Sequence, residues 1–120
     1  MRTLLLIPFL LGSMAQTASP PSWIGHYQVN ADKTVAVETD RGRLSFEFST
    51  SNSQGTCTGD LTVFSSSRAQ RLTLTDQEEE MRCTVQLTRT PRGMTVTESS
   101  GCSAWHGGSC SFAGSYRKTR

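Results

Sequence analysis

The same short pattern stands near both ends of the chain, as WIGHYQ at residues 23–28 and as FAGSYR at residues 112–117. Both copies read aromatic-x-Gly-x-Tyr followed by a polar residue. At strand spacing, residues two and four positions apart share a face, so each copy presents an aromatic ring, a gap and a tyrosine on one side. A sheet that closes on itself pairs its terminal strands and removes both free edges. The repeat therefore predicts a small β-barrel whose closing seam pairs 23–30 with 110–118, with glycines that permit tight coiling.

Apolar and polar residues alternate through the rest of the chain, and clusters of Gly, Pro, Asn, Asp and Ser interrupt the alternation at intervals of roughly 8 to 12 residues. Leu44, Phe46 and Phe48 share one face of a segment whose other face is polar. Met81 begins a second such segment, whose inward face continues with Cys83, Val85 and Leu87. The pattern predicts strands at 23–30, 34–39, 43–49, 56–64, 70–75, 80–90, 94–99 and 110–118, with turns at 31–33, 40–42, 50–55, 65–69, 75–78 and 91–93.

Short links between successive strands favour an all-β, antiparallel up-and-down barrel of eight strands. An open β-sandwich with the same strands is the alternative. A barrel of this small bore fills with its own side chains, so we expect a solid core and place function on loops and rim.

The first residues have the features of an exported protein. Residues 1–15 read as a cleaved signal peptide, with an apolar run of about half the roughly 20 residues that a membrane span requires. Residues 16–22 are small, polar and proline-bearing, which indicates a flexible leader, and 23–118 form one domain. All four cysteines follow the predicted cleavage site, which fits an oxidising compartment. We therefore expect a periplasmic protein without a membrane span.

The charge balance excludes one class of partner. The chain has 12 basic and 10 acidic residues, and one of the basic residues lies in the predicted signal. A nucleic-acid-binding protein would need a strong basic excess, so nucleic acid is not an expected partner.

The link 99–110 concentrates the residues of the predicted site. We expect Cys102 and Cys110 to bridge each other and to display Ser103, Trp105 and His106 on the closed loop. Cys57 and Cys83 would then form the second disulfide, although the sequence itself allows three connectivities. Cys102, His106 and Cys110 have the spacing Cys-x3-His-x3-Cys and could supply three metal ligands, but the segment offers no obvious fourth ligand. We therefore predict no metal and no cofactor.

Charged turns complete the set of candidate contact residues. Asp76, Glu78, Glu79 and Glu80 occupy a predicted turn and would attract a cationic partner, or form an ordinary solvated hairpin tip. Arg92 lies on another predicted turn, from which a cationic group could enter an acidic cleft.

Catalysis has little support in the sequence. No serine lies in a Gly-x-Ser-x-Gly elbow. The carboxylates Asp60 and Glu98 could form a catalytic pair across strands, yet each is equally a solvent-facing strand residue. The sequence predicts a protein that is not an enzyme.

The C-terminal quarter resembles small exported bacterial domains associated with lysozyme inhibitors. The resemblance is carried by CSAWHGGSCSFAGSY at residues 102–116, with WIGHY at 23–27 and the strand around Cys83. It implies a periplasmic protein that protects peptidoglycan from lysozyme by occupying the substrate cleft. The inhibitory serine and lysine of known lysozyme inhibitors have no match here, so no contact residue is transferred.

Four functions remain in view. The first is inhibition of a peptidoglycan hydrolase, in particular host lysozyme. The second is immunity to a toxin delivered by a competing bacterium, and the third is binding of peptidoglycan or another envelope component without inhibition. A metal carrier is a fourth reading, which requires free thiols.

Overall fold

The computed structural model describes residues 22–120 and contains eight antiparallel strands with two short helical turns. The strands are β1 (Gly25–Asn30), β2 (Lys33–Asp40), β3 (Arg43–Ser51), β4 (Thr58–Ser65), β5 (Arg71–Glu78), β6 (Met81–Arg89), β7 (Gly93–Glu98) and β8 (Gly114–Lys118). Each corresponds to a strand predicted from the alternation. The predicted signal 1–15 and residues 16–21 of the predicted leader lie outside the described residues. Within the described part, no helix is long and apolar enough to cross a membrane.

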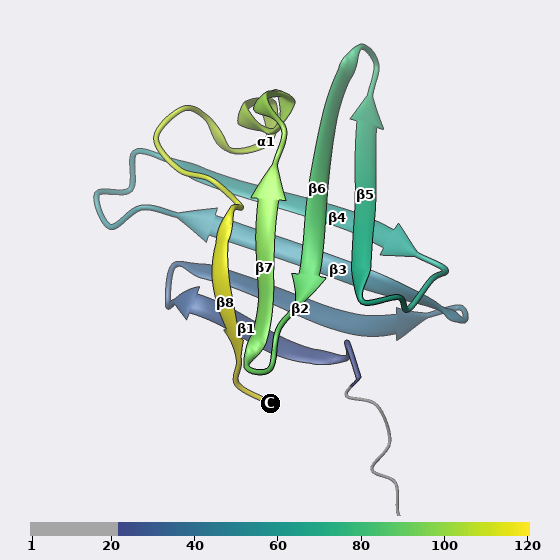
Figure 1. The fold of residues 1–120 in the computed structure, drawn as a ribbon. Helices are drawn as coiled ribbons and strands as arrows, with labels where there is room; N and C mark the ends of the chain where they lie inside the picture. Colours follow the sequence, from purple (N-terminus) through teal and green to yellow (C-terminus); the bar gives the residue numbers. More distant parts are fainter. Residues whose placement is uncertain (1–21) are drawn as a thin grey trace, which may run out of the picture.

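The strands form one sheet in the order β4-β3-β2-β1-β8-β7-β6-β5, which curls into a nearly closed barrel. The first and last strands pair antiparallel, with Tyr27 opposite Lys118 and Gln28 opposite Arg117, so the predicted seam is confirmed. In Figure 1, β5 to β8 cross in front of β1 to β4. The two ends of the sheet are β4 and β5, and no ladder joins these strands in the described part of the chain. The barrel therefore opens between its middle strands rather than at its termini.

One predicted turn is wrong. The alternation of β5 continues through Glu78, and the chain reverses at Glu79 and Glu80, where Glu79 has a φ of 56°. The turn predicted at 75–78 therefore lies in β5, and Asp76 is a strand residue opposite Cys83 of β6. Polar side chains can occupy a strand that extends beyond the core, so composition alone placed the turn too early.

The core fills the barrel with the alternate residues of every strand. Leu44, Phe46 and Phe48 of β3 are buried, as their spacing predicts, and Phe46 lies opposite Val37 and Val63 on the neighbouring strands. Met81 departs from the prediction, because its side chain is 46% exposed. It is the first residue after the β5–β6 turn and lies beyond the core. Because side chains fill the interior of the barrel, we look for a binding surface on its rim and loops.

The two copies of the repeated pattern form the same local structure. The hydroxyl of Tyr27 donates to the carbonyl of Trp23 at 2.6 Å, and the hydroxyl of Tyr116 donates to the carbonyl of Phe112 at 2.7 Å. Both aromatic rings are buried. Because β1 and β8 run antiparallel, the two rings lie toward opposite ends of the barrel, Trp23 edge-on to Phe46 and Phe112 edge-on to Phe48. The repeat therefore closes the core at both ends.

The glycine of the first copy has a steric role. A Cβ on Gly25 would overlap the carbonyl oxygen of Arg120, which accepts a hydrogen bond from the backbone of His26 at 2.8 Å. Gly25 therefore allows the C-terminal residues to pass close to β1, in addition to the coiling expected from the sequence.

Candidate functional site

The connection between β7 and β8, residues 99–113, is called the cap segment here. It contains the 3-10 turn η2 (Ser100–Cys102) and the one-turn helix α1 (Ser103–His106). It shares one end of the barrel with the β1–β2, β3–β4 and β5–β6 links, as Figure 1 shows. We call this the cap end.

Both disulfides attach the cap segment to the barrel wall. Cys102 pairs with Cys83 of β6, and Cys110 pairs with Cys57 just before β4. The predicted Cys102–Cys110 and Cys57–Cys83 pairs are therefore wrong. Helix α1 lies between the two loop cysteines, which reach different walls of the barrel, so each meets a barrel cysteine instead. The closed loops span sequence separations of 19 and 53 residues, and both restrict the unfolded chain.

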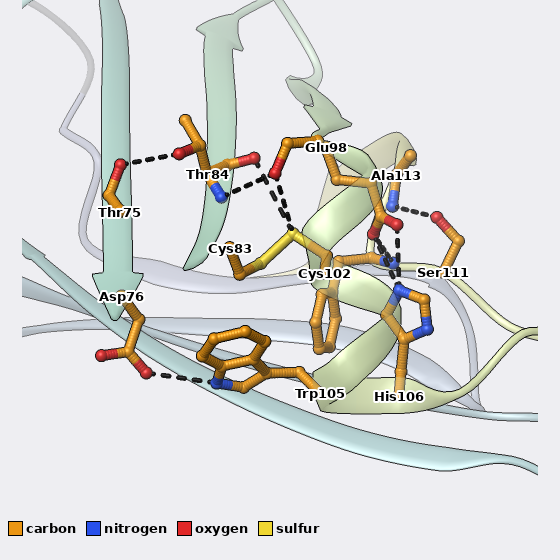
Figure 2. Close-up of a disulfide and its surroundings, with 12 residues drawn as sticks. Thr75, Asp76, Cys83, Thr84, Glu98, Cys102, Trp105, His106, Ser111 and Ala113 are labelled. Atoms are coloured by element: carbon orange, nitrogen blue, oxygen red, sulfur yellow. Dashed lines mark hydrogen bonds and ion pairs between the residues drawn. A yellow bond between two sulfur atoms is a disulfide. The ribbon is translucent and has the colours of Figure 1, made fainter. Parts of the chain in front are cut away.

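Helix α1 lies across the opening between β4 and β5. On one side, a Cβ at Gly59 of β4 would overlap the backbone of His106 and the carbonyl oxygen of Trp105. On the other side, the indole Nε1 of Trp105 donates to Oδ2 of Asp76 on β5 at 3.2 Å, as Figure 2 shows. The cap segment therefore connects the two strands that no ladder joins.

His106 is a buried structural residue. Its Nε2 lies 2.9 Å from Oε2 of Glu98, and its ring packs edge-on against Phe112 with ring centroids 4.9 Å apart. The other carboxylate oxygen of Glu98 accepts the backbone N–H of Phe112 at 2.7 Å. The sequence predicted His106 on the exposed face of a closed loop. One helical turn directs it inward instead, and Gly107, with a φ of 88°, ends the helix.

The sequence does not predict the contacts of Glu98. The Glu98 carboxylate contacts both the His106 ring and the backbone of Phe112, where the second repeat begins. Glu98 belongs to β7, whereas Asp60 belongs to β4, and these strands are not neighbours in the sheet. The two carboxylates considered as a catalytic pair therefore do not face each other across adjacent strands. No local sequence signal identifies these contacts, because all of them depend on the path of the cap segment.

The exposed surface of the cap end includes two groups of residues that bear on function. One is a ridge of small residues, formed by Ser103, Ala104 and Gly107–Ser109. The other is the acidic hairpin tip Glu78–Glu80. Trp105 is partly buried against the core between them. The predicted site residues Ser103, Trp105, Asp76, Glu78, Glu79 and Glu80 therefore lie at one end, and Arg92 lies in the β6–β7 turn at the opposite end.

The two cysteines of the cap segment cannot bind a metal ion as thiolates, because both form disulfides. Cys102 and Cys110 belong to different disulfides. Among the residues described, no three His, Cys, Asp or Glu side chains are grouped to hold a metal ion.

Burial also affects two tyrosines of the seam. Burial raises the pKa of the Tyr116 phenol above its usual value of 10.0, and the nearby Glu98 carboxylate raises it further. Burial likewise raises the pKa of Tyr27, with Arg89 acting in the opposite direction. Both hydroxyls therefore remain neutral donors at physiological pH.

Comparison of the chain with protein-family models, with curated proteins and with solved structures finds no significant match.

Proposed function

We propose that this chain inhibits a peptidoglycan hydrolase of the lysozyme type by occluding its substrate cleft, and that it is not itself an enzyme. The observation that supports the proposal most directly is the composition of the cap end. A ridge of small residues and an acidic hairpin project from the same end of a barrel whose cap segment is fixed by two disulfides.

The rigidity of the cap segment suits an inhibitor. Each disulfide joins it to a different wall of the barrel, and Trp105 and His106 attach it through their side chains to Asp76 and Glu98. A surface that is ordered before binding loses little conformational entropy on binding. Protein inhibitors of hydrolases commonly bind as such preformed surfaces.

The ridge is the part that would enter the cleft. Its residues Ser103, Ala104 and Gly107–Ser109 are exposed and carry short side chains, so the backbone can approach a narrow polysaccharide groove. The resemblance of residues 102–116 to domains associated with lysozyme inhibitors covers the same segment.

The hairpin Glu78–Glu80 would act through its charge. Lysozymes of the animal c-type are cationic proteins, and an acidic patch beside the inhibitory ridge attracts such a partner. Complementary charge of this kind raises the association rate more than the final affinity.

The compartment forms part of the proposal. Two disulfides are typical of exported proteins. We place the protein in the periplasm, where the predicted signal peptide at 1–15 would deliver it.

The test is a lysis-protection assay with protein that begins at Gln16. We expect near-stoichiometric protein to slow hydrolysis of peptidoglycan by c-type lysozyme. The triple variant Glu78→Gln/Glu79→Gln/Glu80→Gln should bind more slowly, with an effect that shrinks as salt is added. The matched control Glu38→Gln/Glu47→Gln/Asp60→Asn changes the net charge equally on the outer face of β2 to β4. Absence of any slowing at a large molar excess would refute the proposal.

A further inference from the structure

The charges of the barrel are separated between its two ends. Apart from Lys33 and Arg82, every lysine and arginine in the described residues lies on the half opposite the cap segment, which we call the basic end. Its basic residues are Arg41, Arg43, Arg68, Arg71, Arg89, Arg92, Arg117, Lys118 and Arg120. The acidic residues on this half are Glu38 and Asp40, and the others lie at the cap end or in mid-strand.

Most of this positive charge has no carboxylate partner. Asp40 contacts Arg41 and Arg43, both at 3.9 Å and both exposed. The other basic residues of this end form no ion pair with any residue that the structure describes. Such an uncompensated surface produces a positive potential that attracts anions.

The basic residues are distributed over a broad rim. They come from the β2–β3 turn, the β4–β5 link, the β6–β7 turn and the residues around the end of β8, which lie along the lower and right-hand side in Figure 1. A shallow hollow of about 500 Å³ is lined by Arg92, Arg117, Lys118 and Arg120, but the remaining arginines lie outside it. An arrangement that spreads around a rim matches an extended anionic surface better than one small anion.

Apolar side chains are exposed within the same rim. Ile24, just before β1, and Phe64, near the end of β4, are each 40% exposed, and the guanidinium of Arg43 lies 3.8 Å above the Phe64 ring. Exposed apolar residues among arginines are typical of proteins that lie on a bilayer, where charge attracts the headgroups and apolar groups enter the interface. Binding of a soluble polyanion would gain nothing from the exposed side chains of Ile24 and Phe64.

We propose that the basic end docks on a lipid bilayer surface rich in anionic phosphate headgroups. Docking in this orientation leaves the cap end facing away from the membrane and free for a protein partner. The inference does not depend on the identity of that partner, because it rests on charge and exposure at the opposite end.

The test is cosedimentation with phosphatidylglycerol vesicles at low ionic strength, with phosphatidylcholine vesicles as the neutral comparison. We expect binding to the anionic vesicles alone, and release as salt is added. The variant Arg92→Ser/Arg117→Ser should lower the partition coefficient by about fivefold for each arginine, on the order of 30-fold together. The control Lys33→Ser/Arg82→Ser, which makes the same charge change at the cap end, should bind as the parent does.

A second pair of variants tests the apolar contribution. Ile24→Ser should weaken binding, whereas Met81→Ser, which removes an apolar side chain of similar exposure at the cap end, should not. The proposal is wrong if the parent does not bind anionic vesicles, or if Arg92→Ser/Arg117→Ser and its control Lys33→Ser/Arg82→Ser lose binding equally. Retention on a heparin matrix without vesicle binding would also overturn it, in favour of a soluble polyanion.

Discussion

The indole of Trp105 donates a hydrogen bond to the carboxylate of Asp76 at 3.2 Å, and so connects the cap segment to β5 at the opening of the barrel. The carbonyl oxygen of Trp105 lies against Gly59 of β4 on the other side of that opening. One residue thus contacts both strands that end the sheet. A change at Trp105 should therefore affect both the stability of the barrel and the predicted contact surface.

A double-mutant cycle measures the strength of this connection. Trp105→Phe removes the indole donor and Asp76→Ala removes the acceptor, so the cycle cancels the packing lost in each single variant. We expect a coupling energy of about 1 kcal/mol from urea denaturation, because the bond is partly buried. Trp105→Phe combined with Glu79→Ala should be additive. Additivity in the first cycle would show that the bond contributes nothing.

A methyl group at Gly59 should displace the cap segment. Its Cβ would overlap the backbone of α1, and neither β4 nor the disulfide-tied segment can move freely. We expect Gly59→Ala to lower the free energy of unfolding by on the order of 2 kcal/mol. Gly108→Ala is the control, since no atom lies within 4 Å of its added Cβ. Equal stability of the two variants would contradict the close contact between α1 and β4.

The disulfide connectivity can be read from peptides. Trypsin leaves Cys102 and Cys110 together in 93–117, and chymotryptic cleavage after Trp105 separates them. Under non-reducing conditions, mass spectrometry should find the fragment with Cys102 joined to the one with Cys83, and the fragment with Cys110 joined to the one with Cys57. A link between the Cys102 fragment and the Cys110 fragment would instead restore the pairing expected from the sequence.

Stability should fall in alkaline solution because Tyr116 is buried. Its pKa is raised in the folded state, whereas in the unfolded chain it stays near 10.0, so the folded state holds the proton more tightly. The resulting contribution is complete below pH 10 and is lost as the pH rises above it. Urea denaturation at about pH 8 and about pH 11 measures the loss. Tyr116→Phe should show a smaller difference between the two conditions, and an unchanged difference would assign the alkaline loss to other groups.

A bulky side chain on the ridge should block inhibition without affecting the fold. A Cβ added at Gly108 meets no atom beyond its chain neighbours within 4 Å, so we expect Gly108→Trp to leave the free protein folded. In a complex the indole would clash with the cleft, at a cost of about 1–3 kcal/mol, or on the order of 10- to 100-fold in affinity. Thr95→Trp, on the exposed face of β7, is the control. Full inhibition by Gly108→Trp would exclude the ridge from the contact surface.

The strands and the seam were predictable because their signals are local. Alternation places Leu44, Phe46 and Phe48 on one face whatever the rest of the chain does, and turn residues interrupt the pattern. The repeat around Tyr27 and Tyr116 marked the two strands that meet, since closure requires the termini to pair. The error at Asp76 arose because acidic composition resembles a turn, while cross-strand pairing with Cys83 extended β5 past it.

The arrangement of the cap end was decided by the tertiary structure. Four cysteines permit three pairings, and the choice depends on where one helical turn directs Cys102 and Cys110. The same turn buries His106 beside Glu98 and leaves the small residues on either side exposed. The nearly balanced composition also did not indicate that basic and acidic residues would gather at opposite ends of the barrel. The sequence alone determined the eight strands, because periodicity is a property of each segment. The opening between β4 and β5, the disulfide pairings and the charged faces exist only once the barrel has formed.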